Sequence, residues 1–217
     1  MRIIRKVSAV YRRRRRLLLA LGAAYVVSMA GGLAVGWWTQ STGEPGAAEE
    51  AQYEAVEGIF GRFREPVREG DIAAIALCAV IILAINLTGA VMRTVGSVAL
   101  VPIAFGLLLT GWQIGRFLPT LTGSSHLSVF LFVLMAALEW TGYVISAAAG
   151  ANIGLGIILP QRFDTPSRWA AFKMSLREAG WMYVAIVAVL SVQAVFEILY
   201  VRKVLAMGGT GVPLGPY

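Results

Sequence analysis

Five separate apolar stretches, each about 20 residues long, constrain this chain more than any other feature of its sequence. A helix rises 1.5 Å per residue, so about 20 residues cross a hydrocarbon core of roughly 30 Å. The stretches are Leu17–Trp38, Ile72–Met92, Val95–Gly115, Leu127–Ala149 and Trp181–Val201. With 58% hydrophobic and 14% charged residues, the composition is that of a membrane protein rather than a soluble domain.

We therefore predict an all-α fold, a polytopic transmembrane helix bundle of about five spanning helices with an outer amphipathic helix. What remains between the spans is too short for a separate soluble domain, so the chain forms one membrane domain. The predicted segments are a basic N-terminus at 1–16, a first span at 17–38, an outer loop at 39–71, a four-helix core at 72–201 and a flexible tail at 202–217.

The distribution of basic residues predicts how the chain is oriented. Eight of the 19 Lys and Arg residues precede Leu17, and five of them form the run Arg12–Arg16. A cytoplasmic N-terminus places 13 basic residues inside and six outside, as the positive-inside rule requires, and makes the loop 160–180 cytoplasmic. Because the basic run abuts an apolar helix, we expect it to face anionic lipid in the cell membrane and not nucleic acid.

The first apolar stretch also follows a basic segment, as in a signal peptide. We expect it to remain uncleaved, because it is longer than the usual 7–15-residue apolar core of such a peptide. It also ends in Trp37 and Trp38, an aromatic pair typical of a membrane interface.

Two apolar regions are too long for one membrane crossing and are expected to turn. As a single helix, Ile72–Gly115 would measure roughly 66 Å, so we predict a tight hairpin at Arg93–Ser97. Leu127–Leu159 would measure roughly 50 Å, and we predict a break after Ala149 with Ile153–Leu159 as a short, re-entrant extension. The residues that indicate this break are Gly150, Asn152, Gly154 and Gly156.

The outer loop contains a helical apolar stripe between Tyr53 and Val67, with charged residues on the other faces. This pattern predicts an amphipathic helix, and two placements are open. The helix lies on the outer membrane surface, or it packs over the outer mouth of the bundle.

Five polar residues inside or beside the apolar stretches form the candidate site, an intramembrane polar cluster. An ionised carboxylate near the middle of a span costs about 2.5–3.5 kcal/mol on insertion scales. Two interpretations remain open: a proton or ion path or partner-contact site, or hydrogen bonds that hold helices together. The candidates are Asn86, Glu139, Asn152, Gln193 and Glu197, and the last two are four residues apart, hence on one helix face.

Residues for familiar enzyme chemistry are missing from the sequence. It has one histidine, His126, and one cysteine, Cys78, which we interpret as a packing residue, and it has no HExxH, GxSxG, P-loop or Rossmann pattern. We therefore expect no enzymatic activity, no metal site and no cofactor.

The order of these features resembles the stage II sporulation protein M family of multi-pass membrane proteins. An Asn-bearing span is followed by a Gly-rich segment, a span with a central Glu and a last span that ends in an acidic residue. The resemblance covers roughly residues 17–201, and its stretches are Ile82–Leu87, Ile103–Gly106, Trp112–Gly115, Ala137–Trp140, Ala147–Gly156 and Ala194–Glu197. Family members often have a His-Gly pair where this chain has Met135-Ala136, so no role that needs the histidine is carried over.

The resemblance implies a non-enzymatic membrane scaffold or assembly subunit that acts through other membrane proteins or as a homo-oligomer. Members in spore-forming bacteria look like scaffolds for cell-wall-degrading partners during engulfment. On this hypothesis Tyr53–Val67 and a surface with Asn86 and Glu139 would receive partners. The alternative is a small transporter or permease component with Glu139 as the proton- or ion-coupling residue.

Overall fold

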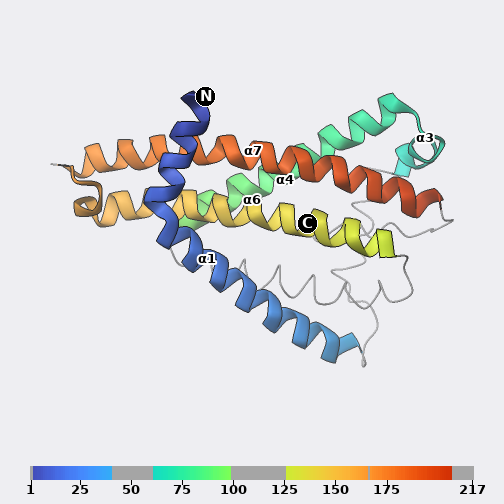
Figure 1. Cartoon of the computed structure of the whole chain (residues 1–217), viewed down its shortest axis with the longest axis horizontal. Coiled ribbons are helices and arrows are strands. Elements are labelled where there is room, and N and C mark those ends of the chain that lie inside the picture. Colours follow the sequence, from blue (N-terminus) through green and yellow to red (C-terminus); the bar gives the residue numbers. More distant parts are fainter. Residues whose placement is uncertain (1, 41–60, 99–125, 166, 207–217) are drawn as a thin grey trace.

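The computed structural model describes residues 2–40, 61–98, 126–165 and 167–206, and the regular elements among them are all helices (Figure 1). The predicted all-α class is thus confirmed. Helix α6 lies along α7, α4 packs against both, and α1 crosses the pair. The elements are α1 (Arg2–Gln40), η1 (Gly61–Phe63), α3 (Arg64–Glu69), α4 (Ile72–Val98), α6 (His126–Ile158), η3 (Pro160–Phe163) and α7 (Arg168–Ala206).

Three of the described helices are long and apolar enough to cross a bilayer, fewer than the five or so predicted. They are α4, the part of α6 from Phe130, and α7 as far as Lys203. The span predicted at Leu17–Trp38 lies within α1, which is helical throughout but is not one of the three. Most of Val95–Gly115 lies outside the described residues.

Helix α4 continues through the point where a hairpin was predicted. The predicted position of the hairpin was wrong, because α4 includes Arg93–Ser97 and extends to Val98. The helix buries a single stripe of mostly small or polar residues that does not stop at Arg93, so neighbouring helices support it throughout. The buried residues are Ala74, Cys78, Ile82, Asn86, Ala90, Thr94 and Ser97.

Helix α6 is likewise unbroken, and the predicted break after Ala149 with a re-entrant extension was wrong. The glycines that suggested it are close-contact positions instead. A Cβ on Gly150 would overlap the Thr94 carbonyl, and one on Gly154 would overlap the Val98 carbonyl. The two glycines therefore let α6 approach the backbone of α4, as small residues spaced four apart do in membrane bundles.

Helix α7 begins earlier than predicted, so the connection expected over 160–180 is much shorter. The chain turns through η3, and the Ser167 hydroxyl accepts a hydrogen bond of 3.2 Å from the Ala170 amide at the start of α7. At its other end, α7 runs to Ala206, so the first residues of the predicted flexible tail are helical. With 39 residues, α7 is about 58 Å long and exceeds the hydrocarbon thickness.

Part of the predicted outer amphipathic helix is described. Gly61–Phe63 forms a 3-10 turn and α3 follows as far as Glu69, whereas Tyr53–Phe60 lies outside the described residues. Val67 is 2% exposed and packs with residues of α4 and α7. In this part, then, the segment packs on the end of the bundle, which is the second of the two placements.

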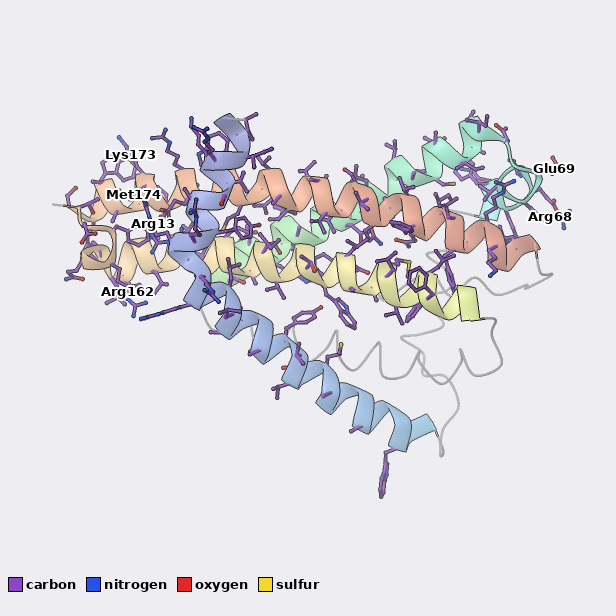
Figure 2. All side chains as sticks on the ribbon, viewed as in Figure 1. Arg13, Arg68, Glu69, Arg162, Lys173 and Met174 are labelled. Carbon is purple, nitrogen blue, oxygen red and sulfur yellow. The ribbon has the colours of Figure 1, made fainter. Side chains whose placement is uncertain are left out.

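The bundle has two chemically distinct ends. Figure 2 shows Arg13, Arg162 and Lys173 towards one end and Arg68 and Glu69 at the other. Helices α4 and α6 run towards the first end and α7 runs back, so the segments predicted inside share one end and α3 lies at the opposite one (Figure 1).

Candidate functional site: two polar clusters that join the helices

A chain of hydrogen bonds, the core polar chain, connects three helices through Tyr143, Asn86, Gln193 and Glu197. The Tyr143 hydroxyl on α6 donates to Asn86 Oδ1 on α4 at 3.1 Å. Asn86 Nδ2 donates to Gln193 Oε1 on α7 at 2.8 Å, and Gln193 Nε2 donates to Glu197 Oε2 at 2.5 Å. The structure thus brings together three of the five predicted site residues.

The core polar chain is directional, and each amide has its orientation fixed. Asn86 uses its oxygen towards α6 and its nitrogen towards α7, while Gln193 accepts from α4 and donates along its own helix. Asn86 and Gln193 are 0% exposed. Inside hydrocarbon an unpaired amide is costly, so these bonds hold α4, α6 and α7 in one register.

Glu139, the fourth predicted residue, joins this chain at its α6 end, where its carboxyl group shares a hydrogen bond with the Tyr143 side chain. It is 4% exposed, lies next to Tyr143 and is within electrostatic reach of Glu197. Its Oε1 accepts no hydrogen bond from the described residues. Glu139 Oε1 therefore remains able to accept a hydrogen bond at the centre of the described bundle.

Two residues near the C-terminal end of α4 add further polar contacts. The Arg93 guanidinium lies 3.5 Å from the centre of the Tyr143 ring, a cation–π contact that brings a positive charge towards the Glu139 carboxyl group. The Thr94 hydroxyl is 2.8 Å from that of Tyr183 and 3.0 Å from the Ser146 carbonyl oxygen. The residues predicted to form a turn instead fasten α4 to α6 and α7.

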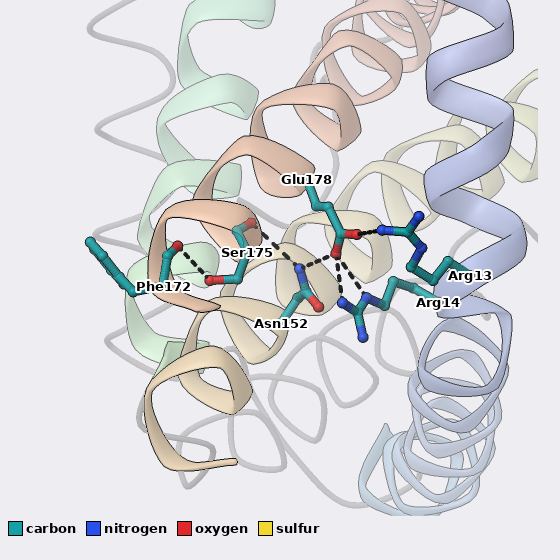
Figure 3. A network of polar contacts seen from close by, with 6 residues as sticks. All are labelled: Arg13, Arg14, Asn152, Phe172, Ser175 and Glu178. Carbon is teal, nitrogen blue, oxygen red and sulfur yellow. Dashed lines mark hydrogen bonds and ion pairs between the residues drawn. The ribbon is translucent and has the colours of Figure 1, made fainter. Parts of the chain in front are cut away.

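A second cluster, the Glu178 clamp, ties α1 to α7 (Figure 3). Glu178 Oε1 accepts a hydrogen bond from Arg13 at 2.8 Å, and Oε2 accepts one from Arg14 Nε at 2.8 Å. Asn152 Nδ2 of α6 donates to the same Oε2 at 3.1 Å and lies 3.4 Å from the Ser175 carbonyl oxygen. Glu178 is 4% exposed, so this carboxylate is enclosed by two cations and an amide.

Asn152, the fifth predicted residue, therefore belongs to a different cluster from the other four. The Glu178 clamp is further closed by the Arg14 guanidinium, which lies 4.2 Å from the centre of the Phe163 ring. The sequence favours a lipid-facing anchor for the basic run at 12–16, but two of its members, Arg13 and Arg14, bind Glu178. Lys6 likewise lies 4.9 Å from the centre of the Trp181 ring.

Sequence reasoning missed Tyr143 and Glu178. The charge pattern places Glu178 in the predicted loop 160–180, yet a helical stripe passes through it without interruption from the start of α7 into the last span. That stripe is buried in the structure and was the available signal for a longer helix. Its members are Ala171, Ser175, Glu178, Met182, Ile186, Leu190, Gln193 and Glu197.

The chemistry that these clusters offer is hydrogen bonding and charge pairing. Within the described part of the chain, no three His, Cys, Asp or Glu side chains lie close enough together to hold a metal ion. Both clusters consist of polar groups from different helices that bind one another, and both lie at helix contacts.

The sequence profile for stage II sporulation protein M matches residues 25–200, about four fifths of the chain. The chain belongs to the stage II sporulation protein M family. No curated protein and no solved structure matches it. The family region contains the core polar chain, Glu139, Asn152 and Glu178, whereas Arg13 and Arg14 precede it. The family membership and the three long apolar helices together indicate that the chain is a membrane protein.

Proposed function

We propose that this member of the stage II sporulation protein M family is a non-enzymatic scaffold or assembly subunit of a membrane protein complex. It resides in the cell membrane with its N-terminus in the cytoplasm. It acts through contacts with other membrane proteins or with a second copy of itself.

The observation that carries the proposal is the mutual pairing of the intramembrane polar groups. Asn86, Tyr143, Gln193 and Glu197 use one another as partners across three helices, and each is less than 4% exposed. Groups committed in this way stabilise one arrangement of helices and leave little free to bind a solute. A helix bundle whose described polar groups mostly bind one another is what a scaffold requires.

Partner contact on this proposal uses the end of the bundle that carries α3. Asn86 and Glu139 are enclosed by the chain's own helices, so they are not a surface for partners, contrary to the hypothesis from sequence. Helix α3 instead exposes Glu65, Arg68 and Glu69 on a segment whose Val67 side chain holds it against the bundle. A short, charged and firmly placed segment suits recognition of an extracytoplasmic part of another membrane protein.

One observation favours the second candidate, a proton- or ion-coupled transporter component. Glu139 Oε1 is buried and accepts no hydrogen bond from the described residues. An intramembrane carboxyl with spare capacity is the kind of group that carriers use to bind a cation or proton.

Flux measurements on purified protein in liposomes separate the two functions. Proton flux under an imposed pH gradient is measured with a trapped pH-sensitive dye for the wild type, Glu139→Gln, and Glu69→Gln as an exposed-carboxyl control. The scaffold proposal predicts flux equal to that of protein-free liposomes in all three. Wild-type flux that is lost in Glu139→Gln and kept in Glu69→Gln would overturn it in favour of the carrier.

A positive test of the scaffold uses photo-crosslinking amino acids in native membranes. The cross-linker replaces Arg68 on α3 or Val80, which is 61% exposed on α4. The proposal predicts a discrete product with another membrane protein, or with a second copy, from position 68. Equal, diffuse labelling from both positions would count against partner contact at α3.

A further inference from the structure

We propose that residues 3–16 of α1, the N-terminal arm, form an interfacial helix that binds the headgroups of anionic phospholipids. The inference is separate from the scaffold function, since it concerns how the bundle is held in the membrane. Four observations carry it: the faces of the arm, its position along the bundle, its charge and its apolar tip.

The arm is amphipathic with respect to the bundle. Val10 is 8% exposed and joins the core between α6 and α7, with Tyr11 packed beside it. Arg5, Arg12 and Arg16 are exposed, and their spacing of seven and four residues places them on one face of the helix. One face of the arm is thus occupied by protein and another presents a row of guanidinium groups.

The Glu178 clamp fixes the position of the arm along the long axis of the bundle. Arg13 and Arg14 bind Glu178 three residues before Trp181, where the apolar stretch of α7 begins. Figure 1 shows the first turns of α1 crossing α7 and α6 steeply, and only the later turns diverging obliquely from them. A helix that crosses spanning helices at this level lies along the membrane surface.

The charge at this end of the bundle is strongly positive. Residues 2–40 contain no acidic side chain, and residues 150–180 contain two, Asp164 and Glu178. Glu178 is already enclosed by the Glu178 clamp, so it cannot neutralise the exposed row. Phosphate-bearing headgroups in an anionic leaflet are attracted to such a surface.

Exposed apolar side chains distinguish a lipid from a soluble anion as the occupant. Ile3 and Ile4 are 57% and 73% exposed beside Arg5, and Leu19 is 60% exposed beyond Arg16. A free phosphate would use the arginines alone. A phospholipid would also contact the apolar side chains with its acyl chains.

Native mass spectrometry of the purified full chain in detergent tests the binding, with phosphatidylglycerol as the probe and phosphatidylcholine as the neutral reference. We expect Arg5→Gln/Arg12→Gln/Arg16→Gln to lower phosphatidylglycerol affinity at least about tenfold, since each basic residue near an anionic surface contributes appreciably. The matched variant Arg162→Gln/Arg168→Gln/Lys173→Gln removes the same charge at the same end and should keep the affinity within about twofold.

Equal losses in the two triple variants would show a general charge effect and overturn the proposal, as would no loss in the first. The last measurement of this experiment adds an excess of inorganic phosphate. If it displaces the lipid completely, the site is an anion site rather than a lipid site, which also overturns the proposal.

A depth measurement tests the placement without depending on affinity. A nitroxide is attached at Ile4→Cys in a Cys78→Ala background, and a second preparation carries it at Asp164→Cys. In liposomes that contain phosphatidylglycerol, the label at position 4 should be protected from a water-soluble nickel relaxant and accessible to oxygen, whereas the label at 164 should show the reverse. Aqueous exposure of both labels would contradict an arm in the interface.

Discussion

Asn86 and Gln193 meet through a hydrogen bond of 2.8 Å between α4 and α7, although 107 positions separate them in the sequence. Each amide also bonds a second group, Tyr143 on α6 or Glu197 on α7. The contact therefore links three helices, and a shift of any one helix along its axis would break a bond. Interhelical bonds in membranes contribute about 0.6 kcal/mol on average, so their value here lies in fixing register as much as in stability.

Gly150→Ala should weaken the contact between α4 and α6. The new methyl group would overlap the Thr94 carbonyl oxygen and crowd Ser97, and overpacking of this kind costs about 1–3 kcal/mol. Gly180→Ala is the matched control, because nothing lies within 4 Å of a Cβ there and Ala favours the helix by about 1 kcal/mol. Thermal unfolding in detergent should show a lower midpoint for the first variant and an unchanged or higher one for the second.

Glu178→Gln should release α1 from the bundle. The change leaves two arginines without their countercharge, and we expect a loss of about 2 kcal/mol, below the usual 3–5 for a buried pair because Arg13 is largely exposed. Spin labels on α1 and α7 should give a longer and broader distance distribution than in the wild type. Glu69→Gln, at the exposed end of α3, should leave that distribution unchanged.

Gly70→Ala should loosen α3. Gly70 ends α3 with φ +88°, which an L side chain rarely adopts, and its Cβ would lie 2.9 Å from Arg202 Nη2. The strain should amount to about 1–2 kcal/mol and appear as faster hydrogen exchange in residues 64–69. Adding Arg202→Gln to Gly70→Ala removes the steric contact but leaves the unfavourable φ, so we expect hydrogen exchange to return only part of the way to the wild-type rate. A full return to that rate would show that φ contributes nothing.

The Tyr11 hydroxyl should lose its proton only at unusually high pH. Burial of its hydroxyl raises the pKa of Tyr11 to about 12, and the hydroxyl has no hydrogen-bond partner among the described residues. Since the pKa is higher in the folded state, the associated stability is complete below about pH 10 and is lost as pH rises towards 12. Difference titration of tyrosinate absorbance between the wild type and Tyr11→Phe should show one group with a midpoint near 12; a midpoint near 10 would contradict the burial.

The sequence was sufficient for the helical class and for three of the spanning helices, because both depend on local hydrophobicity and length. It misplaced the ends of those helices for a physical reason. Glycines such as Gly150 and Gly154 destabilise helices in water, yet inside a bundle they allow backbones to approach. The same residues thus predict a break or a contact, depending on a neighbour that the sequence does not specify.

The pairing of polar residues could be foreseen only within a helix. The spacing of Gln193 and Glu197 placed them on one face, and they bond each other. That Asn86 would meet Gln193, or that Asn152 would join Glu178 and not Glu139, depends on the axial offset between helices. Glu178 itself was within reach of sequence reasoning, because the buried stripe of α7 continues through it.

The most direct test of the central claim, that the intramembrane polar residues fasten helices to one another, is a double-mutant cycle on Asn86 and Gln193. The free energy of unfolding is measured in bicelles for Asn86→Leu, Gln193→Leu and the double variant. The bond between Asn86 and Tyr143 is lost in one single variant, and the bond between Gln193 and Glu197 is lost in the other. Both are also lost in the double variant, so their contributions cancel in the cycle. The account predicts a coupling of about 0.6–1.7 kcal/mol, with the double variant less impaired than the sum of the singles. Additivity within about 0.3 kcal/mol would contradict it.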